Sequence, residues 1–260
     1  MNRNENAVVQ GKHHMIAAIT QSKIIALAQA HRAMRIDWPG RGEAPPGYMP
    51  GIACAYAQVY AAWKRGDEFA LEMARANTHD AERDALSWYA GEFTSFHMDN
   101  GANGANTLRH LAVLAAALGT NESSGGRDIG HDTTAGHETS KMAEAGIFQM
   151  SMNCFDATPL LPDLYAAWLS NHDDSLYDVF YKDIRHTAAN LLNIGDGPGR
   201  DFQDNLKKFP ALAFWLIMLA LRYVRSAWGP INRREVTLEP AVDDLLKQVQ
   251  AIVDAEGAIA

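Results

Sequence analysis

A carboxylate at the end of an apolar helix is the first feature of the sequence that suggests chemistry. Residues 107–118 are apolar at helical spacing, which predicts a buried helix that Gly119 closes. Glu122 follows, and Ser and Gly residues then lead to Asp128. The sequence therefore predicts an acidic side chain held where a packed helix meets a long polar loop.

A second segment, after this loop, has polar side chains at regular spacing. Gln149, Ser151 and Asn153 alternate with the apolar residues Phe148, Met150 and Met152. On an extended segment this alternation places amide and hydroxyl groups on one face. Gly146 indicates a close approach of the backbone to another group. We therefore predict a short strand whose polar face binds a ligand rich in hydroxyls and amides, such as a sugar.

The two segments together resemble the lysozyme superfamily. Glu122-Ser123 at a helix end, a Gly-rich loop and then Gly146-Ile-Phe-Gln149 are similar to the Glu-Ser and Gly-Leu-Met-Gln motifs of goose-type lysozymes and soluble lytic transglycosylases. The stretch 119–153 also resembles a group of bacterial and fungal lysozyme-like proteins. That group carries a C-terminal Trp-Gly-Pro-Ile-Asn-Arg, which is present here at 228–233. Outside these stretches the resemblance is weak.

The resemblance implies that Glu122 is the general acid in the cleavage of an amino-sugar glycan, with peptidoglycan as the expected substrate. A glycosidic oxygen must be protonated as its bond breaks. A carboxylic acid does this at neutral pH only when burial raises its pKa, and the dipole at a helix C-terminus acts in the same direction. We therefore expect a muramidase-like glycoside hydrolase. A lytic transglycosylase, or a chitinase or chitosanase, is the alternative on the same fold.

The second catalytic group is left open by the resemblance. Hydrolases that invert or retain configuration use a second carboxylate, whereas transglycosylases use a hydroxyl of the substrate. Asp128, which lies in a Gly-Arg-Asp motif, is the favoured candidate, and Asp132, Glu138 and Glu144 are alternatives. A structural role, in which Arg127 and Asp128 brace the loop through turn hydrogen bonds, is equally compatible with the sequence.

Further residues are expected to contact the sugar chain. Aromatic faces stack on sugar rings, so Trp228 is predicted either to line the groove or to belong to the core. Trp38 and Tyr48 are weaker candidates for the opposite wall. The complete set of expected substrate contacts is Ser123, Thr139, Gly146, Phe148, Gln149, Ser151, Asn153, Trp228 and Asn232.

Two other classes of function compete with this interpretation. His131, Asp132, His137 and Glu138 place imidazoles and carboxylates close together in the sequence, as zinc favours. Their spacing matches none of the His-Glu-x-x-His arrays, so a metal-dependent hydrolase is the more distant alternative. We expect neither a metal nor an organic cofactor. A protein that binds glycan without cleaving it is the non-enzymatic alternative.

Helical patterns dominate the rest of the chain. Strand signals are limited to 145–152 and 235–238. The predicted fold is mainly α, a lysozyme-like helical domain with a very short sheet or extended strand beside the helix that carries Glu122. We expect one domain over 1–260, with 1–95 as an added N-terminal helical layer on a catalytic core at 96–260. Helices are predicted at 13–35, 51–64, 67–76, 78–89, 160–170, 175–193, 206–227 and 240–255, with Asp67 and Thr78 as N-caps.

Composition and charge limit the partners and the location. The formal net charge is −8 without a basic stripe, so nucleic acid is not an expected partner. The N-terminus shows no secretory signal, and the apolar run 209–221 is too short to span a bilayer and predicts a core helix. Cys54 and Cys154 are expected to be buried thiols. We expect a protein made in the cytoplasm that acts on the periplasm or cell wall of a target cell, as a secreted antibacterial effector or an endolysin. An effector would have an immunity protein or an export component as a further partner.

Overall fold

Helices make up most of the protein, which confirms the mainly-α prediction. The computed structural model describes residues 16–130, 139–171, 176–181 and 192–257. Within these ranges there is no sheet, and extended pairing is limited to two isolated bridges. The helices are α2 (Ala18–Ala30), η1 (Arg32–Arg35), α3 (Tyr48–Lys64), α4 (Glu68–Met73), α5 (Ala85–Trp88), α6 (Ala90–Ser95), α7 (Ala105–Ser123), η2 (Met152–Ala157), α8 (Leu160–Asn171), α9 (Tyr177–Tyr181), α10 (Gly197–Lys208), α11 (Pro210–Ala220), η4 (Arg225–Ala227), α12 (Gly229–Asn232) and α13 (Pro240–Gly257).

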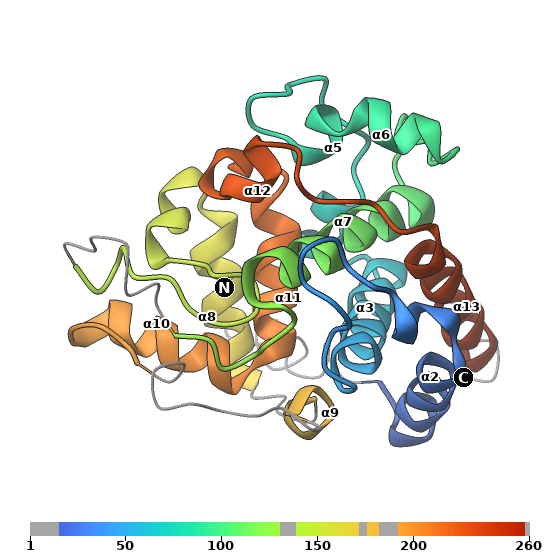
Figure 1. The fold of residues 1–260 in the computed structure, drawn as a ribbon, viewed down its shortest axis with the longest axis horizontal. Coiled ribbons are helices and arrows are strands. Elements are labelled where there is room, and N and C mark those ends of the chain that lie inside the picture. Colours follow the sequence, from blue (N-terminus) through green and yellow to red (C-terminus); the bar gives the residue numbers. More distant parts are fainter. Residues whose placement is uncertain (1–15, 131–138, 172–175, 182–191, 258–260) are drawn as a thin grey trace, which may run out of the picture.

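The core is built around helices α3, α7 and α11. Every residue of α11 is buried, as expected for a helix that is apolar on all sides. Helices α3, α7, α8 and α10 pack against α11, and α13 packs on α3 and α7. Figure 1 shows α11 crossing α7 near the centre of the molecule, with α2, α3 and α13 on one side and α8 and α10 on the other. Buried side chains from Ile24 to Val253 form a single hydrophobic cluster, so α3 shares one core with α7 and α13.

Two expectations about burial agree with the structure. Cys54 and Cys154 are both buried and unbridged. The apolar run 209–221 forms the buried helix α11. In the ranges that the structure describes, no helix combines the length and the apolar character that a membrane span requires.

Helix α7 continues beyond Gly119, where the sequence predicted its end. Gly119 lies inside the helix because neighbouring parts of the chain approach it closely. A Cβ atom on this residue would lie 2.4 Å from the hydroxyl of Tyr48 and 2.8 Å from the ring of Phe148. Tyr48 also donates a hydrogen bond of 2.6 Å to the carbonyl of Ala116. The glycine is therefore a packing position, and the last turn of α7 lies beyond it.

The end of α7 is made by its backbone conformation. Ser124 is left-handed, with φ 53°, and Gly125 follows with φ 77°. The N–H of Ser124 donates to the carbonyl of Thr120 at 2.9 Å. Such a left-handed residue after the last helical residue is a common way to end a helix. As a result, Glu122 lies in the last turn of α7 rather than in the loop.

The segment 145–150 forms a tight turn, so the predicted strand over 145–152 is wrong. Ala145 and Met150 exchange backbone hydrogen bonds of 3.0 and 3.1 Å. The chain then enters η2 without an extended stretch. Because side chains of a turn do not alternate between two faces, the predicted row of polar groups is not formed.

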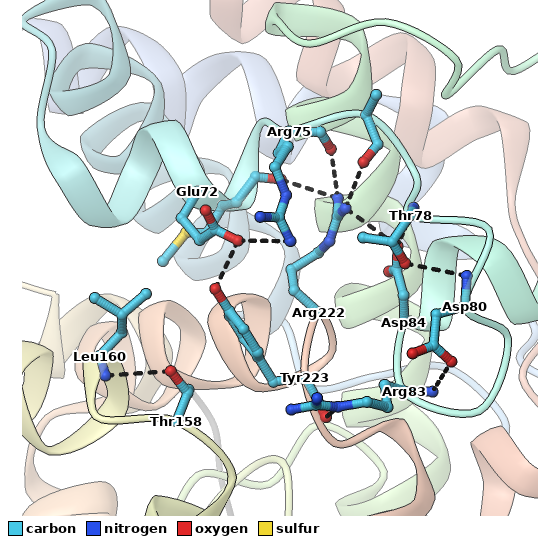
Figure 2. A network of polar contacts seen from close by, with 12 residues as sticks. Glu72, Arg75, Thr78, Asp80, Arg83, Asp84, Thr158, Leu160, Arg222 and Tyr223 are labelled. Carbon is cyan, nitrogen blue, oxygen red and sulfur yellow. Dashed lines mark hydrogen bonds and ion pairs between the residues drawn. The ribbon is translucent and has the colours of Figure 1, made fainter.

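A buried polar network joins the end of α11 to the connection between α4 and α5. Arg222 and Asp84 form an ion pair of 3.1 Å, and both side chains are fully buried. The guanidinium of Arg222 also donates to the carbonyls of Arg75 at 2.7 Å and Ala76 at 2.8 Å. Figure 2 shows these bonds converging on Arg222, and shows Thr78 beside Asp84. The network fastens the connection between α4 and α5 to the core.

Candidate functional site

Glu122 lies in the last turn of α7, and its side chain is partly buried. Burial raises the pKa of its carboxyl from the usual 4.5 to about 7, and the negative charge of Glu144 acts in the same direction. The cations Arg41 and Arg233 lower this pKa, and Glu235 raises it. A substantial fraction of Glu122 therefore holds its proton at neutral pH.

The cationic neighbour Arg41 comes from a tight turn before α3. The N–H of Trp38 donates to the carbonyl of Gly42 at 3.1 Å, which closes the turn and leaves Arg41 exposed. The segment after Glu122 packs close by, since a Cβ atom on Gly125 would lie 3.1 Å from Pro45. The turn before α3 thus borders the end of α7.

A second group of charges follows α12, which packs against α7. Arg233 and Glu235 lie on the surface and form a bidentate ion pair, with N–O distances of 2.6 and 2.8 Å. Together with Arg41 they place exposed charges of both signs around Glu122. These charges are exposed to solvent, so they tune the pKa of Glu122 less than its burial does.

Among the carboxylates that the structure describes, Glu144 has the largest electrostatic effect on Glu122. It directly precedes the turn 145–150, and the side chains of Ile147 and Phe148 in this turn lie against Gly119 of α7. The turn therefore holds Glu144 beside the last turn of α7. In the sequence Glu144 was an alternative to Asp128 for the second carboxylate.

Asp128, the favoured second carboxylate, is bound to a buried arginine. Its Oδ1 lies 2.6 Å from Nη1 of Arg127, and the two side chains are 12% and 2% exposed. Nη1 of Arg127 also donates to the carbonyl of Lys207 at 2.8 Å. The charged groups with the largest effects on Glu122 do not include Asp128. This arrangement agrees with the bracing role that the sequence left open.

The predicted ligand contacts Gln149 and Gly146 instead stabilise the turn itself. Nε2 of Gln149 donates to the carbonyl of Gly146 at 3.0 Å, and the N–H of Gly146 donates to the carbonyl of Ile129 at 2.8 Å. Gly146 has φ 73°, and a Cβ atom on it would lie 3.3 Å from that of Leu206 in α10. The close approach predicted for Gly146 is therefore made to α10.

The aromatic residues of the two motifs belong to the core. Phe148 is fully buried, and Trp228 is 3% exposed. Nε1 of Trp228 donates to the carbonyl of Phe148 at 2.8 Å, so the tail motif supports the turn. Trp38 and Tyr48 are also buried. None of these four rings lies on the surface where a sugar would stack.

The remaining predicted contacts are polar and at least partly exposed. The hydroxyl of Ser123 donates to the carbonyl of Gly119 at 3.0 Å within α7. Ser151 donates to the side chain of Asn153. Asn232 donates to the carbonyl of Ser226 at 2.8 Å. Thr139 is exposed. Of these, Ser123 is nearest in the chain to Glu122.

A separate open groove lies between α8, α10 and η2, with a volume of about 380 Å³. It does not include any of the site residues predicted from the sequence. Its lining residues are Met152, Tyr165, Leu169, Pro198, Asp201, Asp204 and Asn205.

The metal alternative rests on residues outside the described ranges. His131, Asp132, His137 and Glu138 all lie in the undescribed segment 131–138. Among the residues that are described, no group of three or more His, Cys, Asp or Glu side chains is arranged to hold a metal ion. Glu138 and Asp132 likewise stay untested as second carboxylates.

Sequence reasoning named Glu144 but did not connect Arg41, Arg233 or Glu235 with Glu122. Arg233 belongs to the tail motif at 228–233, and this membership was the only feature of the sequence that pointed to it. No sequence pattern pointed to Arg41 or Glu235, because only folding brings their segments to the end of α7.

No protein-family model matches the chain, and no curated protein or solved structure matches it.

Proposed function

We propose that the protein is a lysozyme-like glycoside hydrolase that cleaves the glycan strands of peptidoglycan, with Glu122 as the general acid. The observation that carries the proposal is a partly buried carboxyl in the last turn of α7, with its pKa raised to about 7. An acid whose pKa lies near the working pH is both protonated and able to give up its proton. The motifs around Glu122 and Gly146 supply the class of substrate.

The charges around Glu122 suit the proton transfer. When Glu122 protonates the glycosidic oxygen, it becomes an anion, and Arg41 and Arg233 favour that anion. Glu144 opposes the anion and keeps the resting carboxyl protonated. Among the described carboxylates Glu144 has the largest electrostatic effect on Glu122, and we propose that it stabilises the cationic sugar or directs a water molecule. In this proposal Glu144 takes the role of second acid that the sequence favoured for Asp128.

A lytic transglycosylase is the second candidate, and the pairing of Asp128 with Arg127 favours it. The carboxylate of Asp128 is engaged in an ion pair with the buried guanidinium of Arg127, so it is poorly placed to take a proton from water. A transglycosylase needs no such base, because a hydroxyl of the substrate attacks. For both candidates the proposed place of action is the periplasm or cell wall of a target cell.

The test is the isosteric variant Glu122→Gln, which removes the proton donor. We expect its activity on purified peptidoglycan to fall by about 100-fold or more, with an unchanged circular dichroism spectrum. Glu68→Gln is the matched control, because Glu68 is an exposed carboxylate in the first turn of α4. Full activity of the Glu122 variant would show that the acid is assigned wrongly.

The products distinguish the two candidates. Mass spectrometry of digested peptidoglycan gives reducing ends for a hydrolase and 1,6-anhydro ends for a transglycosylase. The same assay on chitin and chitosan tests the alternative substrates. Binding to peptidoglycan without any new chain ends would instead support the non-enzymatic alternative.

A further inference from the structure

Arg127 anchors the segment 124–130, which follows Glu122 directly. Its side chain is buried, and its guanidinium lies over two rings of α9, 3.8 Å from the ring centre of Tyr177 and 4.4 Å from that of Tyr181. Planar guanidinium groups stack on aromatic faces more readily than an ammonium does. The segment that leaves α7 is therefore fixed to α9.

The same guanidinium also binds α10. Nη1 of Arg127 donates to the carbonyl of Lys207, near the end of α10, and contacts the carboxylate of Asp128. Asp128 supplies the negative charge that a buried cation requires. Arg127 and Asp128 thus fasten one short segment to two separate helices.

The fixed segment in turn holds the turn that follows Glu144. The carbonyl of Ile129, next to Asp128, accepts a hydrogen bond of 2.8 Å from the N–H of Gly146. Nε2 of Gln149 lies 3.5 Å from the same carbonyl. The segment 124–130 therefore connects the residues that follow Glu122 with those that follow Glu144.

We propose that Arg127 and Asp128 are positioning residues that hold the carboxyl groups of Glu122 and Glu144 at a fixed separation. The proposal rests on the proposed function, since it concerns the two carboxylates of that site. Asp128 balances the charge of Arg127. Arg127 fixes the segment in which the carbonyl of Ile129 accepts the hydrogen bond from Gly146. Neither residue exchanges a proton with the substrate.

A fixed separation matters because acid catalysis depends strongly on distance. A displacement of a reacting group by about 1 Å lowers rates by roughly 100-fold. Among the described residues, the charges that act on Glu122 are Glu144 and Glu235, which raise its pKa, and Arg41 and Arg233, which lower it. Loosening the turn would move Glu144 away and admit water, and both changes favour the ionised form of Glu122.

The test uses Arg127→Lys, which keeps the charge but loses the planar stack on the tyrosine rings. We expect kcat on soluble peptidoglycan fragments to fall about tenfold with little change in KM. We also expect the titration midpoint of Glu122, followed by carbon NMR of its carboxyl, to move to lower pH by about 0.5 to 1. Because the net charge is conserved, that movement reports geometry. Arg127→Met should lower kcat further, but it also removes a positive charge, so only the Lys variant is used for the titration.

The second buried pair, Asp84 with Arg222, provides the matched control. Asp84→Asn should lower stability without moving the titration midpoint of Glu122 or changing kcat of the folded fraction. If Arg127→Lys is less stable but keeps both kcat and the midpoint, Arg127 has only a structural role and the proposal is overturned. The NMR titration needs only folded protein, so it decides the matter even if turnover is slow.

The results also separate this proposal from the function itself. Full activity of Glu122→Gln contradicts the proposed function, whatever Arg127→Lys does. An inactive Glu122→Gln together with an unaffected Arg127→Lys contradicts only the positioning role.

Asp128→Asn adds a further distinction, because an amide can still accept a bond from Arg127. If Asp128 were the catalytic base, this variant would lose activity as severely as Glu122→Gln, and the positioning role would be wrong.

Discussion

At the scale of single residues, burial and charge decide the pH at which Glu122 is able to act. A general acid must hold its proton, so activity should fall as the pH rises through the pKa of about 7. Burial is the largest cause of the raised pKa, and Glu144 is the next. Arg41 and Arg233 partly offset both. Burial of Glu122 therefore sets its pKa near neutral pH, and the neighbouring charges make smaller adjustments to that pKa.

Two substitutions test this balance in opposite directions. Glu144→Gln removes a like charge, so the pKa of Glu122 should fall and the alkaline limb of the pH–rate profile should move to lower pH. Arg41→Ala removes an opposite charge and should move that limb to higher pH, by a smaller amount at high salt because Arg41 is exposed. The measurement is kcat/KM against pH for both variants, with Glu68→Gln as control. Shifts of the same sign in both variants would contradict the proposed arrangement of charges.

At the scale of elements, the sequence predicts helix starts from capping side chains, and one of its two predicted N-caps is confirmed. Asp67 caps α4 as predicted, since its carboxylate accepts a bond of 2.9 Å from the N–H of Ala70. The prediction of Thr78 as a cap is wrong. Asp84 instead accepts bonds from the N–H and the hydroxyl of Thr78 and begins α5 itself. Both residues are good caps, and only the buried partner Arg222 decides between them.

Other elements depend on contacts that the sequence does not reveal. The predicted helix 206–227 is divided at Pro210, which ends α10 and begins α11. The alternation over 145–152 also fits a tight turn, because Phe148 and Met150 are buried without being in a strand. Gly119 resembles a helix end, although its role is to let Tyr48 approach α7. A short pattern is therefore compatible with several structures until packing selects one.

The close packing around Gly119 predicts that even an alanine at this position lowers the free energy of unfolding substantially. Gly119→Ala should destabilise the protein by about 1–3 kcal/mol, because a Cβ atom would overlap the hydroxyl of Tyr48. It should also reduce activity, since the last turn of α7 carries Glu122. The matched control is Gly91→Ala in α6, where a Cβ atom meets nothing within 4 Å and a gain of about 0.5–1 kcal/mol is expected. Urea unfolding measures both. Equal stability of the two variants would contradict the packing role.

At the scale of the whole molecule, one core supports the site from many parts of the chain. The class of fold and the carboxylate at the end of α7 were predictable, because apolar periodicity and a local motif carry them. The cationic surroundings of Glu122 were not, because Arg41 and Arg233 lie far from it in sequence. The sequence left the role of Asp128 open between catalysis and bracing, since Arg127 finds its further partners in α9 and α10, which only the fold brings near. Local patterns therefore located the carboxylate at the end of α7, and only the tertiary structure showed what surrounds it.

The ion pair between Asp84 and Arg222 tests the cooperativity of this core. Asp84→Ala leaves a fully buried guanidinium without its counter-charge and should cost about 3–5 kcal/mol. The more exposed pair of Lys23 and Glu256 is the comparison, and Glu256→Gln should change stability little. Thermal unfolding followed by circular dichroism should give one transition for every variant. A separate early transition in Asp84→Ala would show that the connection between α4 and α5 unfolds independently of the rest.

The exposure of Arg41 and of the pair formed by Arg233 and Glu235 has an evolutionary consequence. Glu122, the proposed proton donor, lies on a helix that is buried along most of its length, where substitutions are costly. The charges beside it lie on surface segments, where substitutions are cheap. Descendants of this chain could therefore exchange those surface charges while Glu122 and the helix that carries it stay the same.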